Sequence, residues 1–317
     1  MPVTLEPLGM RAQHLHAVGR IGSILALCTV LGCSATYNGE RLFWKAQQRA
    51  AVVAKDPEHA TAAQLSAAVD AYDRVIREAR GTLWAGRAQL AIGSLYMLTK
   101  DYSRARDSYR LVLQNSSQQQ ELCVEARVGI GKSYELEQHW DEAVKAYREL
   151  FDYHPWTKRG LEAPLYVASG FEKRKQSDQA QRAYERAVKL YTKLIADAPS
   201  AEQGAQVRLY LALAYQQLGQ WDQAINVLQE LAKRPTEANR PLVLLTLGRI
   251  YQTKLGNPQK AQEMYQTLLQ EFPEHPLGQM ARKQLEQLGG HPADAAGAAA
   301  QAPAASMAPG QSSAVSP

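Results

Sequence analysis

The chain has 317 residues, of which 45% are hydrophobic and 21% are charged, and its formal net charge at pH 7 is +5. Lysine and arginine alternate with acids in segments such as KAYRE and RAYERAVK and form no basic stripe with interleaved aromatic residues, which argues against a nucleic-acid partner. The three cysteines cannot build a disulfide framework or a metal cluster, and we expect no cofactor and no small-molecule substrate.

The first element in chain order is the apolar run IGSILALCTVL at residues 21–31, which follows Arg20 and precedes Gly32 and Cys33. Eleven residues are too few to span a bilayer and are typical of the apolar part of a secretory signal peptide. The string VLGC resembles the bacterial lipobox, in which the cysteine becomes an acylated N-terminus after cleavage. A plain signal peptide is the alternative, but it leaves a cysteine at this place unexplained.

The lipobox resemblance implies a signal peptide over residues 1–32, lipidation of Cys33 and a linker over residues 33–38. Several acyl chains give durable membrane attachment, so no transmembrane helix is needed after processing. Ser34 after the cysteine is typical of lipoproteins sorted to the outer membrane, and we expect the protein there, facing the periplasm. Met10 would give a leader of more ordinary length than Met1.

Residues 39–288 carry a recurring set of small, aromatic, alanine and proline residues. One copy begins at Gly131 and continues with Tyr134, Ala143, Tyr147 and Pro155. The same offsets start at Gly93, Ala168, Ala212 and Gly248, the last with one inserted residue near Gly256 and Asn257. The copies lie roughly 36–44 residues apart, which is the spacing of helical-hairpin repeats. A weaker hairpin precedes them, with Ala68 and Tyr72 at the second-helix positions.

This pattern resembles the tetratricopeptide repeat, a pair of antiparallel helices A and B. The resemblance implies an all-α, right-handed helical solenoid of about six hairpins. The small residue at Gly131 lets helix A approach helix B, and Pro155 ends helix B. In the copy that begins at Ala168, the apolar pattern runs on to Pro199, and we expect that helix B, near residues 178–198, to be about three turns longer than standard.

The string GIGKS within residues 126–135 could be mistaken for the end of a phosphate-binding loop. That loop requires a glycine five residues before Gly131, and the residue there is Ala126. The preceding stretch QQQELCVE is too polar for a buried strand. We interpret GIGKSY as the middle of a helix A.

The resemblance also implies a concave groove lined by the A helices. In the family, positions two, five, nine and twelve of each repeat contact the ligand. Carried over to this chain, they predict a partner groove of Arg87, Ser94, Lys132, Glu135, Glu162, Ser169, Gln216, Arg249 and Gln252, with Tyr166 and Tyr210 beside them. The Lys/Asn/Arg arrangement with which some relatives clamp a peptide carboxyl terminus is missing, so we expect an internal segment as ligand.

Catalytic chemistry is not indicated. His139, His154 and His275 fall at turns or helix ends, where we expect exposed side chains, and no catalytic or calcium-binding motif is present. Glu135 and Glu137 lie on different faces of a helix and cannot share a proton. We expect Cys123 to be a small buried packing residue.

The last segment, residues 289–317, is rich in Ala, Pro, Gly and Ser, and we expect it to be disordered. The sequence as a whole predicts a non-catalytic envelope scaffold that binds proteins or peptide segments. In plan it is similar to the repeat lipoprotein of the β-barrel assembly machinery. An adaptor lipoprotein for polysaccharide export or peptidoglycan synthesis is the alternative, and a hydrolase or transferase using Glu135 or His154 is a third hypothesis.

Overall fold

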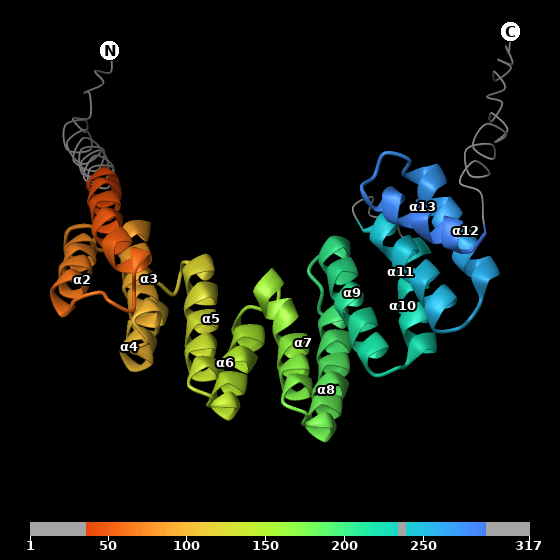
Figure 1. Ribbon diagram of the computed structural model, residues 1–317, viewed down its shortest axis with the longest axis horizontal. Coiled ribbons are helices and arrows are strands. Elements are labelled where there is room, and N and C mark those ends of the chain that lie inside the picture. Colours follow the sequence, from red (N-terminus) through yellow and green to blue (C-terminus); the bar gives the residue numbers. More distant parts are fainter. Residues whose placement is uncertain (1–35, 234–238, 290–317) are drawn as a thin grey trace, which may run out of the picture. The chain divides into compact units, whose positions relative to one another are not determined.

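The computed structural model describes residues 36–233 and 239–289 (Figure 1). The predicted signal peptide, Cys33 and almost all of the predicted tail lie outside these residues. The described part is helical and contains no strand. Its first helix covers residues 36–55 and is called helix 36–55 below; it already includes residues 36–38 of the predicted linker.

The remaining helices continue the pairing that the sequence predicts, so that helix 36–55 and α2 to α12 form six hairpins, with α13 after the last. Neighbouring helices in each hairpin run antiparallel (Figure 1). Their bounds are α2 Ala62–Glu78, α3 Leu83–Leu98, α4 Tyr102–Asn115, α5 Gln120–Leu136, α6 Trp140–Tyr153, α7 Lys158–Lys173, α8 Ser177–Ala196, α9 Ala201–Gln217, α10 Trp221–Lys233, α11 Arg240–Thr253, α12 Pro258–Glu271 and α13 Leu277–Gln287.

The helices fall into two compact units, divided within α7 between Ala163 and Pro164. Pro164 lies inside the helix, where it cannot donate a backbone hydrogen bond. The sequence analysis expects one continuous stack. In a repeat array each hairpin touches mainly its neighbours, so a division at one helix leaves the packing within each unit complete.

Three hairpins close around a glycine on helix A and a tyrosine ring on helix B. A Cβ atom built on Gly131 would lie 2.6 Å from the ring of Tyr147, and one built on Gly93 would lie 2.5 Å from the ring of Tyr109. Gly248 meets Tyr265 in the same way. The predicted role of Gly131 in helix packing is confirmed, and GIGKSY lies inside α5.

The turn between helix A and helix B is also repeated. The residue two places before each of the B helices α4, α6, α8, α10 and α12 has a positive φ, and a backbone bond then runs to the aromatic residue of helix A, as from His139 N to Tyr134 O at 2.9 Å. In the last hairpin the bond from Asn257 N to Tyr251 O spans one residue more, which confirms the predicted insertion. The residues with positive φ at these turns are Lys100, Gln138, Lys175, Gly219 and Gly256.

The extended helix B is α8, and its predicted length is wrong. It has 20 residues, whereas α4, α6 and α12 have 14 each, so the extension is shorter than two turns. The helix ends at Ala196 because Pro199 follows closely and a residue before proline disfavours the helical region.

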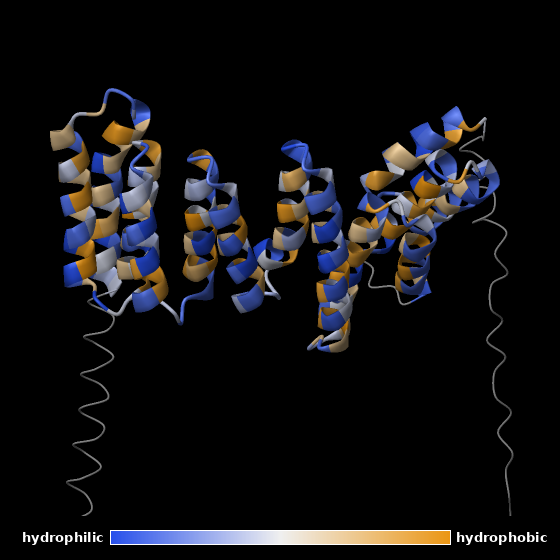
Figure 2. Cartoon of the chain, turned by 90° about the horizontal axis from the view of Figure 1, so that it is seen from below, coloured by the Kyte–Doolittle hydropathy of each residue, from blue (hydrophilic) through white to orange (hydrophobic). Residues whose placement is uncertain are grey.

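Buried side chains lie between the helices of each unit. Tyr72 and Val75 belong to the core of the N-terminal unit, and Tyr191, Tyr265 and Leu268 are fully buried in the C-terminal unit. Figure 2 shows hydrophobic and hydrophilic residues alternating along single helices, as expected for helices packed on one face. Among the described residues, no helix combines the length and apolar character needed to cross a membrane.

Candidate functional site

The candidate functional site is an open cavity of about 460 Å³ in the N-terminal unit, between helix 36–55 and α3. Its lining is largely apolar and includes Arg87 as its one charged side chain. The lining residues are Phe43, Gln47, Ala50, Ala51, Ala54, Tyr72, Arg87, Leu90, Ala91, Ser94, Leu95 and Leu98. We call this cavity the α3 groove.

Two helices form the walls of the α3 groove because the lining residues of each recur at helical spacing and so lie on one face. On helix 36–55 the wall residues recur at intervals of three and four, from Phe43 to Ala54, and most are alanines. On α3 the same spacing runs from Arg87 through Leu90 to Leu98. The alanines on helix 36–55 leave space between the two helices, and the leucines on α3 do not fill it.

Aromatic side chains hold the base of the α3 groove in place. The ring of Phe43 lies 5.5 Å from that of Tyr72 and 5.3 Å from that of Trp84, measured between centroids, and the planes are tilted. Such tilted contacts stabilise a fixed arrangement of the rings. Because Trp84 also carries the guanidinium of Arg87, 4.9 Å above its ring, the one cation of the groove is positioned by the same cluster.

Arg87 and Ser94 are the predicted groove residues that the structure brings together in this cavity. The Ser94 hydroxyl donates to the Leu90 carbonyl at 3.2 Å, within its own helix. Arg87 is half-buried, and its guanidinium has polar edges left for a ligand beside the contact with Trp84. The groove therefore offers an apolar surface and one positive charge.

Two other predicted groove residues hold tyrosine hydroxyls of their own hairpins. Glu135 accepts a hydrogen bond from Tyr147 at 3.2 Å, and Gln252 accepts one from Tyr265 at 2.8 Å. The same tie joins Glu172 to Tyr184 at 2.9 Å, although Glu172 was not predicted as a site residue. These acceptors stabilise the pairing of helix A with helix B.

The remaining predicted groove residues are spread over both units, and no described cavity gathers them. Lys132 is exposed and lies 3.5 Å from Glu135, and Glu162 lies near Lys158 and Arg159 of its own helix. In the C-terminal unit, Tyr166 and Arg249 are exposed, Ser169 and Gln216 are half-buried, and the Tyr210 ring lies 6.0 Å from that of Tyr191.

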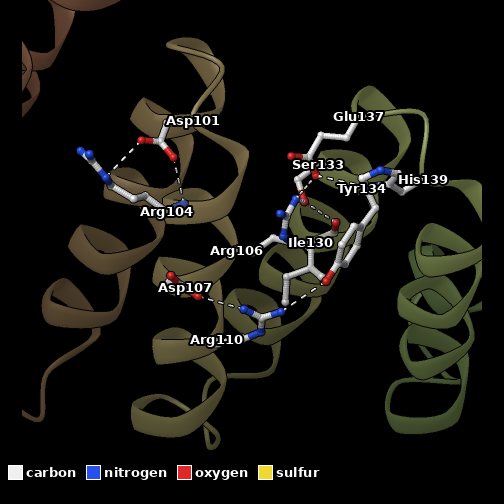
Figure 3. Close-up of polar contacts among 10 residues, drawn as sticks. All are labelled: Asp101, Arg104, Arg106, Asp107, Arg110, Ile130, Ser133, Tyr134, Glu137 and His139. Atoms are coloured by element: carbon white, nitrogen blue, oxygen red, sulfur yellow. Dashed lines mark hydrogen bonds and ion pairs between the residues drawn. The ribbon is translucent and has the colours of Figure 1, made fainter.

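Arginines of α4 are bound to α5 within the N-terminal unit (Figure 3). Arg106, only 12% exposed, is paired with Glu137, donates to Ser133 at 3.3 Å and covers the ring of Tyr134 at 4.3 Å. Arg110 donates to the Tyr134 hydroxyl at 3.4 Å and to Asp107 of its own helix at 2.9 Å. Glu137 thus faces α4, whereas Glu135 faces α6, which confirms that these two carboxylates do not share a site.

The prediction that the turn histidines are exposed is wrong for two of them. His139 is exposed, but His275 is half-buried and accepts from the Leu277 amide at 3.1 Å. His154 is half-buried beside Arg127, with 3.1 Å between ring and guanidinium nitrogens. Burial and the nearby guanidinium lower the pKa of His154 below its ordinary value. The reason is that each ring contacts a neighbouring helix, through Arg127 of α5 for His154 and through the first residue of α13 for His275.

Cys123 is buried in α5, as predicted, with its sulfur 3.4 Å from the Ser116 carbonyl oxygen. Burial raises the pKa of this thiol, which disfavours the reactive thiolate. Within residues 36–233 and 239–289, no group of three His, Cys, Asp or Glu side chains is placed to hold a metal ion.

The wall on helix 36–55 was missed by the sequence analysis. The first hairpin matches the repeat offsets weakly, so no positions of Phe43, Ala50 or Ala54 were carried over from the family. Together with Gln47 they follow one another at intervals of four, three and four residues, a spacing visible in the sequence that would have placed them on one face of a helix.

Comparison with protein-family models finds matches described as tetratricopeptide repeat over residues 57–120, 125–155, 179–241 and 242–275. Together these segments make up more than half of the chain. The match over residues 57–120 contains α2, α3 and α4, and therefore the α3 wall of the α3 groove and the aromatic residues Tyr72 and Trp84 at its base. Proteins with such repeats bind peptides or proteins and generally serve as non-catalytic scaffolds.

Several solved structures are similar at low sequence identity. YrrB, described as a TPR protein with an unusual peptide-binding site, is 19% identical, with 68% of this chain and 99% of YrrB covered and a TM-score of 0.36. TTC0263, a thermophilic TPR protein of Thermus thermophilus, is 17% identical, covering 64% and 98%, with a TM-score of 0.39. The C-terminal part of a repeat protein from Cytophaga hutchinsonii is 12% identical, covering 79% and 98%, with a TM-score of 0.45. No curated protein matches the chain.

Proposed function

Because the chain is a tetratricopeptide-repeat protein, we propose that it is a non-catalytic adaptor that binds a segment of another envelope protein in the α3 groove. The observation that carries the proposal is the apolar cavity of about 460 Å³ between helix 36–55 and α3. Ligand sites in proteins are typically apolar hollows with a few polar groups that fix orientation.

The chemistry of the α3 groove favours a particular kind of segment. Alanines line one wall, so a bulky apolar side chain of the partner can enter, and leucines line the other. Arg87 at the edge can pair with a carboxylate of the partner. We therefore propose an internal, apolar segment with an acidic residue as the ligand, either helical or extended.

The proposal places the protein at the outer membrane, facing the periplasm, with an acyl anchor at Cys33. Support comes from the lipobox-like string at residues 30–33. Replacement of Cys33 by Ala should release the protein from the membrane fraction into the soluble periplasm. If the variant stayed in the membrane, the anchor would have to lie elsewhere.

We further propose that the partner belongs to outer-membrane protein assembly, with polysaccharide export or peptidoglycan synthesis as the alternative pathway. Affinity capture of the C-terminally tagged chain from detergent-solubilised membranes, after mild crosslinking, separates these pathways by the identity of the proteins recovered. Assembly components would support the first, and export or cell-wall enzymes the second.

To test whether the partner binds in the α3 groove, a variant is needed that fills the groove without disturbing the fold. Ala51 is an exposed lining residue, so Ala51→Arg places a long charged side chain in the cavity. Ala67→Arg on α2 is the matched control, since Ala67 is exposed and outside the lining. Ala51→Arg should abolish recovery of the partner, and Ala67→Arg should leave it unchanged; equal recovery in both would contradict the proposal.

A further inference from the structure

The outward face of helix 36–55, away from the core, carries an unusual set of exposed residues. Tyr37, Arg41, Trp44 and Gln48 recur at intervals of four, three and four, and Lys45 lies beside them. They surround a shallow hollow of about 480 Å³. The Tyr37 side chain is 72% exposed and that of Trp44 62%. We call these five residues the Trp44 face.

The last helix of the described residues, α13, has a different outer face. The exposed residues of α13 are mainly polar, including Arg282, Lys283 and Glu286, with Met280 as the one large hydrophobic residue among them. The end of a repeat array needs such a polar face for solubility. An exposed tryptophan and tyrosine at the opposite terminus therefore indicate a surface that another structure covers.

We propose that the Trp44 face lies in the headgroup region of a phospholipid membrane that contains anionic lipids. Tryptophan and tyrosine rings are amphipathic and favour the membrane–water interface. Arg41 and Lys45 can approach phosphate groups on either side of them, while Glu40 is the one acid that lines the hollow. The apolar area is too small for insertion of the helix, so the contact is superficial.

The position of this face in the chain identifies the membrane as its occupant. Helix 36–55 begins three residues after Cys33, the cysteine proposed to carry the acyl chains. Because each peptide unit spans at most about 3.8 Å, Tyr37 lies within about 15 Å of that residue in any conformation of the connecting segment. In this respect the inference rests on the anchor of the proposed function.

Acyl chains that carry bromine close to the headgroup test the contact at a single residue, since they quench the fluorescence of tryptophans that lie at the membrane–water interface. The full chain is reconstituted into vesicles of phosphatidylethanolamine and phosphatidylglycerol, with and without the label, as wild type, Trp44→Phe and Trp156→Phe. Trp156 is half-buried outside this face and serves as the matched control. We expect Trp44→Phe to remove most of the quenching and Trp156→Phe to leave it unchanged.

Two outcomes would overturn the inference. Equal quenching in wild type and Trp44→Phe would show that this tryptophan does not touch lipid. A Trp44-dependent dimer, seen by light scattering of the detergent-solubilised chain together with no quenching in vesicles, would show that a second copy covers the face. The groove variant Ala51→Arg should leave quenching intact, so failure of the membrane contact and failure of the adaptor function are distinguishable.

The charges give a second test. Arg41→Gln with Lys45→Gln removes two cations of the face, and the control Arg182→Gln with Arg186→Gln removes two exposed cations of α8 at the same helical spacing. In the full chain carrying Cys33→Ala, the first pair should weaken binding to the anionic vesicles by roughly thirtyfold and the control pair should not. Equal weakening by both pairs would show that binding depends on the net charge of the protein and not on the Trp44 face.

Discussion

The hairpins α5–α6 and α9–α10 have the same plan and differ at three matched positions. In the first, Gly131 faces Tyr147, whose hydroxyl bonds Glu135. In the second, the corresponding residues are Ala212, Leu228 and Gln216, all at the offsets that the repeat predicts. Between these two hairpins the larger helix A residue goes with the smaller helix B residue, whereas α7–α8 combines Ala168 with Tyr184. The repeat keeps the space between its helices filled, and no single side chain defines it.

The largest expected effect on stability comes from enlarging Gly131, which packs against the Tyr147 ring in the first hairpin. Gly131→Ala improves helix propensity but places a methyl group against the Tyr147 ring, so we expect a loss of about 2 kcal/mol in the free energy of unfolding. Urea denaturation followed by circular dichroism measures it. The double variant Gly131→Ala with Tyr147→Leu copies the second hairpin and should recover part of the loss. A single variant as stable as wild type would refute the packing role of Gly131.

A smaller effect is expected from removing the hydrogen bond between the Tyr147 hydroxyl and Glu135. Tyr147→Phe keeps the ring and removes the hydrogen bond to Glu135, which should lower the free energy of unfolding by about 1 kcal/mol. The reciprocal change, Ala212→Gly with Leu228→Tyr, copies the first hairpin into the second and places a tyrosine hydroxyl where Gln216 can accept a hydrogen bond from it. The urea midpoint of Tyr147→Phe matching that of wild type would show that the bond contributes nothing.

The turns of the two hairpins give opposite expectations for glycine. Gln138 and Gly219 occupy the same turn position with φ of 66° and 69°. Gln138→Gly relieves a left-handed side chain and should stabilise the protein by a few tenths of a kcal/mol, because the added freedom of the unfolded chain offsets part of the gain. Gly219→Ala should destabilise it by about 1 kcal/mol. Thermal melting of both variants checks the signs, and equal signs would be inconsistent with this account.

The smallest effect concerns pH. The pKa of His154 in the folded protein lies below 6.5, through burial and Arg127. Well above pH 6.5 the ring is neutral in both states; as the pH falls toward 6.5 and below, the unfolded state takes up a proton that the folded state binds less readily, so stability declines. His154→Gln should reduce the drop in urea midpoint between pH 7.5 and about 5.5. An unchanged drop would assign it to other groups.

The hairpins show which features the sequence could predict. The offsets from Gly131 to Tyr147 fix which residues face each other, because the helical period and the hairpin length are regular. The tie between Glu135 and Tyr147 was not predicted, although acceptor and tyrosine stand twelve residues apart in two hairpins. The repeat position predicts where the side chain of Glu135 lies. Whether that side chain is free for a ligand depends on the residue opposite it, and here Tyr147 already donates a hydrogen bond to it.

The candidate site was predicted only in part for the same reason. Arg87 and Ser94 follow from the family positions and do line the α3 groove. Its second wall belongs to helix 36–55, whose hairpin matches the repeat weakly. The cavity also depends on the sizes of Ala50 and Ala51, which position alone does not reveal. The groove exists because the side chains of both walls together leave space unfilled, and this cannot be judged from one wall alone.

The most direct test of the adaptor function is site-specific photocrosslinking in cells that make the full chain. A photoreactive residue replaces Ala51 in the α3 groove or Ala67 outside it, and products are resolved by mass. The proposed function predicts one partner protein joined at position 51 and absent at position 67. Equal products at both positions, or none at position 51, would contradict a partner bound in the groove.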